Sequence, residues 1–280
     1  MDLAQSCVVC SSRRIEKRMG IVMPFVAHRV MEYPAAAIMY GGQEIVPTLF
    51  TNSLRCEDCG FIFSQVRYSD DQMARLYKGY RGPEYNEMRS VYEPAYAEFA
   101  ARVGTDEIEI QARQIAMRRF LDGSLDYDAI ESLLDYGGDH GQHIPAFIPA
   151  KKKYVYEVSG VEVLPGIELV RDLDRMAPVD LVINANVLEH LPYPRQALER
   201  IRPLCHRNSR LFVDVPFELK SEDHYPGGFH EHINFFSLKS LQALLSTCGF
   251  EVLKIEMIEC DYEWQKVRSV YALARPAWFG

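Results

Sequence analysis

The chain has 280 residues, enough to bury one sizeable core and a smaller second module. Its hydrophobic share of 48% and charged share of 25% are ordinary for a globular protein, and its formal charge of −8 argues against broad binding to nucleic-acid phosphates. No apolar run approaches the roughly 18 residues of a membrane helix, and the first residues lack the features of a signal peptide, so we expect a cytoplasmic protein that binds neither nucleic acid nor a membrane.

Four cysteines near the N-terminus have the spacing of a metal site. Cys7 and Cys10 form one C-x-x-C pair, and Cys56 and Cys59 form another. Each pair can lie on a tight turn that aims two sulfurs at one point, so we predict a structural Zn²⁺ site with no open coordination position. Four free thiols are the alternative, because a disulfide is not expected in a reducing cytosol. Between the pairs, the segment from Ile38 to Leu49 has residues typical of strands.

A helical segment rich in tyrosine comes next. Ser69 is a good N-cap for a helix that carries Tyr77 and Tyr80 at helical spacing. After a break at 81–83, we expect a further helix that begins near Tyr92 and runs to about Val103. The tyrosines could simply pack between two modules. Alternatively, Tyr77 and Tyr80 line an acceptor pocket, where a phenol can orient a substrate hydroxyl.

Residues Glu107 to Leu121 are predicted to form an amphipathic helix that ends at Asp122-Gly123. We therefore divide the chain into a zinc-binding module (1–68), a Tyr-rich helical linker or cap (69–125) and a C-terminal domain (126–280).

The C-terminal domain opens on a strand and a glycine-rich turn. An apolar run from Ile130 to Leu134 leads into an acidic residue and a cluster of glycines, and a helix is expected from His143 to Ile148. Glycines at such a turn let the backbone approach a ligand closely, and a helix start offers unpaired N–H groups. A purely structural turn is the alternative. The candidate cofactor-binding residues here are Asp135, Tyr136, Gly137, Gly138 and Gly141.

Strands and helices alternate from there to the end. Further strands are expected at 154–158, 163–170, 178–184, 210–215, 250–258 and 267–274, with helices at 194–204 and after Ser237. The run at 178–184 is apolar throughout, as in a parallel strand buried on both faces. Only a short loop separates the last two strands, so they should pair antiparallel. We predict an α/β fold: a Rossmann-like, doubly wound, mostly parallel seven-stranded sheet with the last two strands antiparallel.

The glycine turn resembles the first motif of class I S-adenosylmethionine-dependent methyltransferases, D-x-G-x-G-x-G, with Asp139 at the place of the middle glycine. The later motifs fall in the order of that family. Glu157 ends the second strand, Asp172-Leu173 follows the third, and Asn184 begins the segment N-A-N-V-L-E-H-L after the fourth. The resemblance implies bound S-adenosylmethionine, with Glu157 on the ribose hydroxyls and Asp172 and Leu173 near the adenine.

The four-cysteine module and the tyrosine-rich segment narrow the resemblance to methyltransferases that act on nucleotide-linked deoxysugars, especially sugar C-methyltransferases. That resemblance implies a small-molecule acceptor, a role in sugar biosynthesis, and Glu189, His190, Tyr77 and Tyr80 near the acceptor. Those enzymes usually carry a further C-terminal domain, whereas this sequence ends after its last expected strand. We therefore leave open whether carbon, oxygen or nitrogen is methylated.

Methyl transfer is an in-line displacement that requires alignment of the acceptor and removal of one proton, for which histidine is a suitable base. We predict His190 as the general base, with a purely structural role as the alternative. His232 is the second candidate, in a loop after the fifth strand that suits an acceptor-side lid. A metal at 230–232 is not expected, because the H-E-x-x-H spacing is missing.

Two other functions are compatible with the sequence. The chain could be a non-catalytic scaffold that keeps the cofactor fold, although the intact Asp135, Glu157 and glycine turn argue against this. It could also methylate a protein. A nucleic-acid substrate is disfavoured by the charge of −8 and by N-A-N-V where base-methylating enzymes have N/D-P-P-Y/F.

Overall fold

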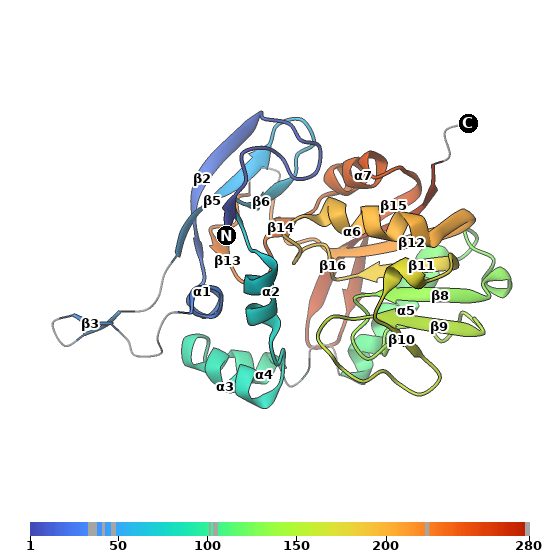
Figure 1. Cartoon of the computed structure of the whole chain (residues 1–280), viewed down its shortest axis with the longest axis horizontal. Helices are drawn as coiled ribbons and strands as arrows, with labels where there is room; N and C mark the ends of the chain where they lie inside the picture. Colours follow the sequence, from blue (N-terminus) through green and yellow to red (C-terminus); the bar gives the residue numbers. More distant parts are fainter. Residues whose placement is uncertain are drawn as a thin grey trace.

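The computed structural model describes residues 1–32, 38–40, 43–45, 49–100, 102, 106–221 and 224–277, and for residues 38–40, 43–45, 97 and 99 it describes the backbone alone. No helix within these ranges is long and apolar enough to cross a membrane. The N-terminal half is built on a five-stranded sheet and the C-terminal half on a seven-stranded sheet, at the left and right of Figure 1.

The C-terminal sheet has the strand order β10-β9-β8-β11-β12-β16-β15. Its strands are β8 (Ser132–Tyr136), β9 (Lys152–Tyr156), β10 (Glu168–Val170), β11 (Val179–Ala185), β12 (Cys205–Pro216), β15 (Phe250–Asp261) and β16 (Lys266–Pro276). The first five in this spatial order are parallel, and β16 is antiparallel to both of its neighbours. The predicted fold class is confirmed. The strand order reverses between β8 and β11, which is where such sheets bind ligands.

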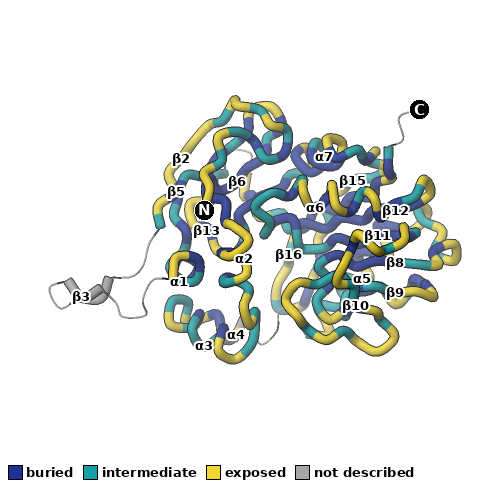
Figure 2. The backbone as a smooth tube through the Cα atoms, in the orientation of Figure 1, coloured by how far each residue is buried: buried dark blue, intermediate teal, exposed yellow. Residues whose placement is uncertain are grey.

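Helices cover both faces of this sheet. The helices α6 (Pro194–Ile201) and α7 (Leu238–Thr247) share an apolar cluster with Leu134 of β8, whereas α5 (Glu107–Leu121) shares another with Leu133. Consecutive side chains of a strand point to opposite faces, so α5 lies on one face and the other two helices on the opposite face. This is the predicted doubly wound arrangement, and its central strands β8, β11 and β12 form the buried layer in Figure 2.

Three short 3₁₀ helices complete the C-terminal half: η1 (Tyr127–Ala129), η2 (Leu173–Arg175) and η3 (Arg202–Leu204). η3 continues α6, so together they span the helix predicted at 194–204.

The helix predicted from His143 to Ile148 is not formed, and turns and bends occupy this segment. Pro145 and Pro149 explain the error, because proline lacks the N–H donor and disfavours helical backbone at the residue before it. The glycine turn therefore leads into an irregular crossover to β9, without the helix start that was expected to supply unpaired N–H groups.

The N-terminal sheet has the order β13-β2-β5-β6-β14 and takes strands from two distant parts of the chain. Its strands are β2 (Ile15–Val22), β5 (Leu49–Cys56), β6 (Ile62–Ser64), β13 (Gly228–Phe229) and β14 (Asn234–Phe235). Two further pairs are β1 (Asp2–Leu3) with β7 (Val66–Arg67), and β3 (Ile38–Tyr40) with β4 (Gln43–Ile45). The loop predicted as a lid thus contributes two strands to this sheet, one on each side of His232.

Four helices follow or flank that sheet: α1 (Pro24–Met31), α2 (Asp70–Tyr77), α3 (Pro83–Tyr92) and α4 (Tyr96–Ala100). Ser69 caps α2 through a complete capping box, as predicted. The helix expected from Tyr92 instead divides into the end of α3 and the short α4, and its predicted end at Val103 lies outside the described residues.

One apolar core joins the two halves. Phe61 and Phe63 of the N-terminal module belong to the same buried cluster as Leu198 of α6 and Leu241 of α7. The ring centroids of Phe61 and Phe236 are 4.9 Å apart. The N-terminal sheet is therefore packed against the C-terminal half rather than tethered to it, and it can contribute side chains to a shared site.

Candidate active site and zinc cluster

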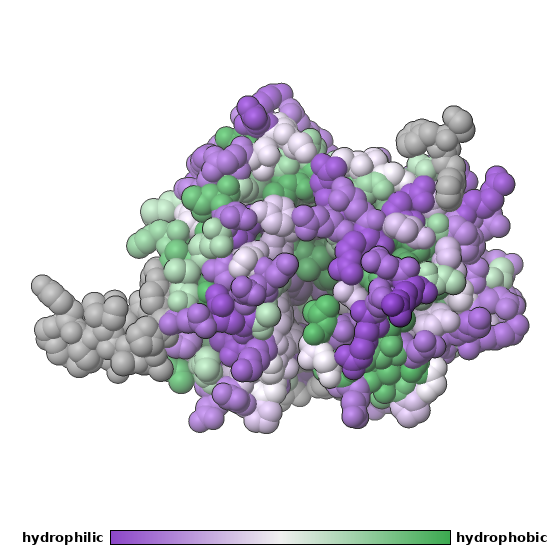
Figure 3. All heavy atoms as spheres, in the orientation of Figure 1, coloured by the Kyte–Doolittle hydropathy of each residue, from purple (hydrophilic) through white to green (hydrophobic). Residues whose placement is uncertain are grey.

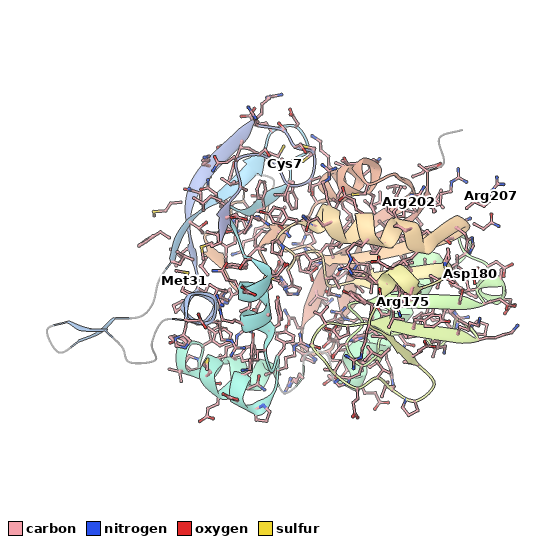
Figure 4. The ribbon with its side chains drawn as sticks, viewed as in Figure 1. Cys7, Met31, Arg175, Asp180, Arg202 and Arg207 are labelled. Carbon is pink, nitrogen blue, oxygen red and sulfur yellow. The ribbon has the colours of Figure 1, made fainter. Side chains whose placement is uncertain are left out.

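The four cysteines predicted as zinc ligands converge at one end of the N-terminal sheet, where Figure 4 labels Cys7. Cys7 Sγ lies 3.6 Å from Cys59 Sγ, and Cys10 Sγ lies 3.5 Å from Cys56 Sγ. All four sulfurs lie within 4.8 Å of one another, and all four residues are free thiols. A tetrahedral Zn²⁺ ion with Zn–S bonds near 2.3 Å separates its sulfurs by about 3.8 Å. The cluster therefore fits a structural zinc ion.

A cavity of about 2000 Å³ lies between the two halves of the chain. Ligand pockets usually measure roughly 300–1,000 Å³, so this cavity has room for a cofactor and an acceptor together. The space-filling view shows a recess between the halves on the face turned to the viewer (Figure 3). One wall contains the glycine turn after β8, and another contains Tyr77 and the loop after β11.

The glycine turn is shaped by close packing around Asp135. Gly137 has φ of 81°, a left-handed conformation that favours glycine, and a Cβ there would lie 2.5 Å from Val187. A Cβ on Gly138 would lie 2.5 Å from the Asp135 carboxyl carbon. Burial raises the pKa of Asp135 to about 7, and the nearby carboxylates of Glu157 and Asp139 add to this rise. Among the described residues no cationic side chain forms an ion pair with Asp135, which suits a positively charged ligand at this part of the cavity.

Glu157 is held in place by backbone donors. Its Oε1 accepts hydrogen bonds from the N–H groups of Val158 (2.7 Å) and Ser159 (2.8 Å), and its Oε2 accepts one from Asp139 N–H (3.3 Å). It lines the cavity together with Tyr136, which ends β8. The carboxylate is therefore fixed one strand away from the glycine turn, in the position that binds ribose hydroxyls in such sheets.

Four of the predicted cofactor residues do not line this cavity. The side chain of Asn184 is fully buried and donates to the carbonyl oxygen of Tyr136 (3.2 Å), so it supports the turn from behind. Gly141 packs against Ile167. Asp172 caps η2 and pairs with Arg175, while Leu173 is buried in the core. The structure does not bring Asp172 and Leu173 to the other candidate residues.

The residues predicted near the acceptor do come together. Tyr77 Oη lies 2.8 Å from His190 Nδ1, and the ring of Tyr80 packs edge-on against Tyr77 with centroids 5.1 Å apart. His190 Nε2 lies 3.7 Å from Glu189 Oε1, and the rings of His190 and His232 are 4.6 Å apart. Burial raises the pKa of Tyr77 well above its ordinary value and raises that of Tyr80 to about 12, so both phenols remain protonated at neutral pH.

The two histidines are held in opposite charge states. Burial lowers the pKa of His190 to about 3, and the neighbouring His232 contributes to this, so His190 is neutral. Burial also lowers the pKa of His232, but the Glu218 carboxylate at 2.8 Å from Nδ1 outweighs this and raises it to about 9. Burial raises the pKa of Glu189 to about 8. At neutral pH His190 is therefore a neutral imidazole with one unprotonated ring nitrogen, whereas His232 carries a proton on both.

A buried arginine that the sequence analysis missed fixes the loop after β11. Arg67 is fully buried and donates to the carbonyl oxygens of Pro192 (3.0 Å) and Ser64 and to Asn234 Oδ1 (2.8 Å). Asn234 in turn donates to the carbonyl oxygens of Leu188 (2.8 Å) and Leu191 (2.7 Å). These bonds flank Glu189 and His190 and hold their backbone. No local motif marks such residues, because their partners are distant in sequence.

Glu231 was also missed as a positioning residue. It is buried, forms an ion pair with Arg89 of α3 and accepts a hydrogen bond from Tyr85 Oη (2.7 Å). Its carbonyl oxygen lies 3.4 Å from His190 Nδ1. The tyrosine-rich helices thus bind the segment that carries His232. In the sequence, the run His-Glu-His was the signal that could have pointed to Glu231 as a positioning residue.

Comparisons with known proteins identify the family of this chain. The family described as a methyltransferase domain matches residues 87–255. The C-methyltransferase NovU of Streptomyces niveus is 26% identical over 140 residues, which cover 44% of this chain and 33% of NovU. The chain thus matches about a third of the length of this curated relative.

One solved structure has the same fold over most of its length, and a second is similar at a lower TM-score. The 1,6-didemethyltoxoflavin-N1-methyltransferase of Burkholderia thailandensis, with bound 1,6-didemethyltoxoflavin and S-adenosylhomocysteine, is 15% identical. Its TM-score is 0.50, and the match covers 80% of this chain and 98% of that one. The dimethyltransferase RosA of Streptomyces davawensis is 17% identical with a TM-score of 0.48, covering 72% of this chain and 62% of that one.

Proposed function

We propose that this chain, which belongs to the methyltransferase-domain family, is an S-adenosylmethionine-dependent methyltransferase whose acceptor is a small molecule, a nucleotide-linked sugar or a related metabolite. One observation carries the proposal. A single cavity is lined by the glycine turn with Glu157 and by Tyr77, His190 and His232. A cofactor on the first wall and an acceptor on the second would share one cavity, as in-line transfer requires.

We assign the cofactor to Asp135, Tyr136, Gly137, Gly138 and Glu157. S-adenosylmethionine is a cation, and it would supply the positive charge that the buried Asp135 lacks. The oriented Glu157 carboxylate would accept hydrogen bonds from the ribose hydroxyls. Gly141 and Asn184 would shape the turn without touching the cofactor, and Asp172 and Leu173 are left out of the assignment.

The cavity offers cationic and aromatic side chains to a nucleotide-linked acceptor. Lys266 and Arg268 of β16 line it, together with the rings of Phe217 and Trp264. Cationic side chains stabilise a diphosphate, and aromatic faces stack on nucleobases. The Arg268 guanidinium lies 5.0 Å from the centre of the Phe217 ring, so charge and aromatic surface are adjacent there.

The chemistry assigned to the chain is alignment and proton removal. Bound S-adenosylmethionine would supply an activated methyl group. The carbonyl of Glu231 near His190 Nδ1 can only accept a hydrogen bond, so it favours the tautomer with the proton on Nδ1 and a free lone pair on Nε2. His190 Nε2 would take the acceptor proton, and the nearby Glu189 carboxyl group would stabilise the imidazolium. Tyr77 would fix the ring, and Tyr80 would support Tyr77.

A methyl-transfer assay with S-adenosylmethionine tests this proposal. Two acceptor panels, nucleotide-linked sugars and short peptides, would be followed by mass spectrometry for one added methyl group. We expect transfer to the nucleotide-linked panel alone, and Arg268→Gln should raise KM for these acceptors about tenfold. Arg210→Gln is the control, because Arg210 is remote from the cavity lining. Transfer to peptides alone would favour the protein-methylating alternative, and cofactor binding without any transfer would favour the scaffold.

A further inference from the structure

Glu189 is an unusual side chain for the wall of a cavity. Its side chain is 1% exposed, and neither carboxylate oxygen has a hydrogen-bond partner among the residues that the structure describes. A buried carboxylate without donors carries a large desolvation cost. Glu189 nevertheless belongs to the lining of a ligand cavity, and one of its oxygens lies close to two imidazole rings. Such a group is best stabilised by a cation that binds between it and the rings.

The two histidines are oriented toward such a cation. His232 Nδ1 is engaged by Glu218 Oε2 at 2.8 Å, so Nε2 is the nitrogen that would bind a metal ion, in exchange for the proton that it carries at neutral pH. His190 Nδ1 is engaged by Tyr77 Oη at 2.8 Å, and its Nε2 lies 3.7 Å from Glu189 Oε1. One ligand atom from each of the three residues lies within 4.8 Å of the others. A histidine whose second nitrogen is held by a carboxylate or another polar partner is the usual form of a metal ligand.

We propose that Glu189, His190 and His232 bind a divalent transition-metal ion, with further coordination positions open to water or an acceptor oxygen. Two imidazoles and one carboxylate suit Zn²⁺, Co²⁺ or Ni²⁺ and differ from the thiolate set of the cysteine cluster. Glu218 and Tyr77 are the outer partners that orient the two rings. The ion and the proton compete for His190 Nε2, so metal binding and the role of His190 as a base exclude one another.

Cobalt binding tests the site directly, and it requires no knowledge of the acceptor. The full-length protein with zinc in its cysteine cluster would be titrated with Co²⁺, followed by visible absorption and by metal analysis after dialysis. We expect one further Co²⁺ per chain, with d–d absorption but without the sulfur-to-cobalt charge transfer of a thiolate site. Bound Co²⁺ should also slow methyl transfer, because it occupies the base.

Four variants make the assignment specific. Glu189→Gln and His232→Asn should each lose the second Co²⁺, and Glu218→Gln should weaken it about tenfold as an outer partner. His230→Asn is the matched control, because His230 is two residues away and pairs with Glu93 instead (3.2 Å). Circular dichroism and affinity for S-adenosylmethionine show whether each variant is folded. If Glu189→Gln is not folded, the conclusion is drawn from His232→Asn.

Two results would overturn the proposal: no Co²⁺ beyond the cysteine cluster in the unaltered protein, or a second Co²⁺ that persists in both Glu189→Gln and His232→Asn. Either result would leave the proposed methyl transfer unaffected, since cofactor binding and turnover are measured separately.

Discussion

The Tyr77 hydroxyl lies 2.8 Å from His190 Nδ1, and this contact joins the two halves of the molecule. Tyr77 ends α2 in the N-terminal half, whereas His190 follows β11 of the C-terminal sheet. The two residues are 113 positions apart in the sequence. The orientation of the proposed base is therefore set by a residue outside the cofactor-binding fold, so the N-terminal half takes part in the site.

Replacing Tyr77 with phenylalanine tests this dependence. A neutral hydrogen bond contributes about 0.5–1.5 kcal/mol, so Tyr77→Phe should lower kcat by about 3- to 10-fold. The affinity for S-adenosylmethionine, measured by calorimetry, should not change, because Tyr77 is assigned to the acceptor side.

Tyr92→Phe is the matched control for that variant. Tyr92 Oη also contacts a histidine, His28 Nδ1 at 3.2 Å, but neither residue lines the cavity. The kcat of the Tyr92→Phe variant should equal that of the unaltered enzyme. Equal losses in both variants would mean that Tyr77 acts only through general stability.

The elements that could be predicted are those with strong local signals. The apolar run of β11, the cap at Ser69 and the break after Leu121 each specify structure within a few residues. The prediction of a helix from His143 was wrong. A helix often follows a glycine turn, but the two prolines in this segment prevent regular helical hydrogen bonding. The sharing of the N-terminal sheet with β13 and β14 was not foreseeable, since pairing across more than 160 residues leaves no local pattern.

The residues of the candidate site also divide into those that could be predicted from the sequence and those that could not. His190 and Tyr77 were identified from the sequence and meet in the cavity. Arg67 and Glu218 were missed, because a buried arginine and an outer carboxylate look like surface residues in sequence. Asp172 was predicted by its position after a strand, but it caps η2 and turns away from the cavity. Motif position predicts which strand ends approach a ligand, but it does not predict the direction of each side chain.

A zinc ion bound by the four-cysteine cluster should determine the stability of the N-terminal half. Cys56→Ser removes one sulfur of the cluster, and Cys56 lies in the core that joins both halves. We expect loss of bound zinc and a fall in Tm of about 10 °C, since several kcal/mol of metal-dependent folding energy disappear. Metal analysis and thermal unfolding measure the two effects.

Cys248→Ser provides the comparison for the zinc prediction, because Cys248 is buried in the same core but lies outside the cluster. It should keep its full zinc content and lose little stability. Normal stability in Cys56→Ser, or equal zinc loss in both variants, would contradict a structural zinc site.

Arg67 should be essential for the loop that carries His190. Arg67→Met leaves the carbonyl oxygen of Pro192 and the Asn234 amide oxygen without their buried donor. Leaving a buried acceptor without its donor costs about 1–3 kcal/mol, which urea unfolding would detect. Arg275→Met is the control: Arg275 makes a two-bond pair with Glu251 at 2.8 and 3.0 Å, but at the surface, where an ion pair contributes about 0–1 kcal/mol. Similar losses in both variants would exclude a special role for Arg67.

Asp135 should make the cofactor-free protein less stable as the pH rises. Burial raises its pKa from the ordinary value of 3.8 to about 7, with Glu157 and Asp139 facing it. Between these two values the folded state holds a proton that the unfolded state has lost, so the free energy of unfolding falls as pH increases and the penalty is complete above about pH 7. Asp135→Asn removes the penalty. This variant should therefore be more stable than the unaltered protein at pH 8, by about 2–4 kcal/mol, and equally stable near pH 4.

Asp180→Asn should change stability in the opposite direction, by lowering the free energy of unfolding at neutral pH. Partial burial raises the pKa of Asp180, but hydrogen bonds from Ser132 and His206 outweigh this and leave the pKa lowered. The unaltered protein then gains stability from Asp180 at neutral pH, and this gain disappears as pH falls through the lowered pKa. Urea unfolding from pH 4 to 8 compares the two variants. If Asp135→Asn is destabilised at pH 8, the carboxylate is already balanced in the free protein, and a cationic cofactor has no unpaired charge to satisfy.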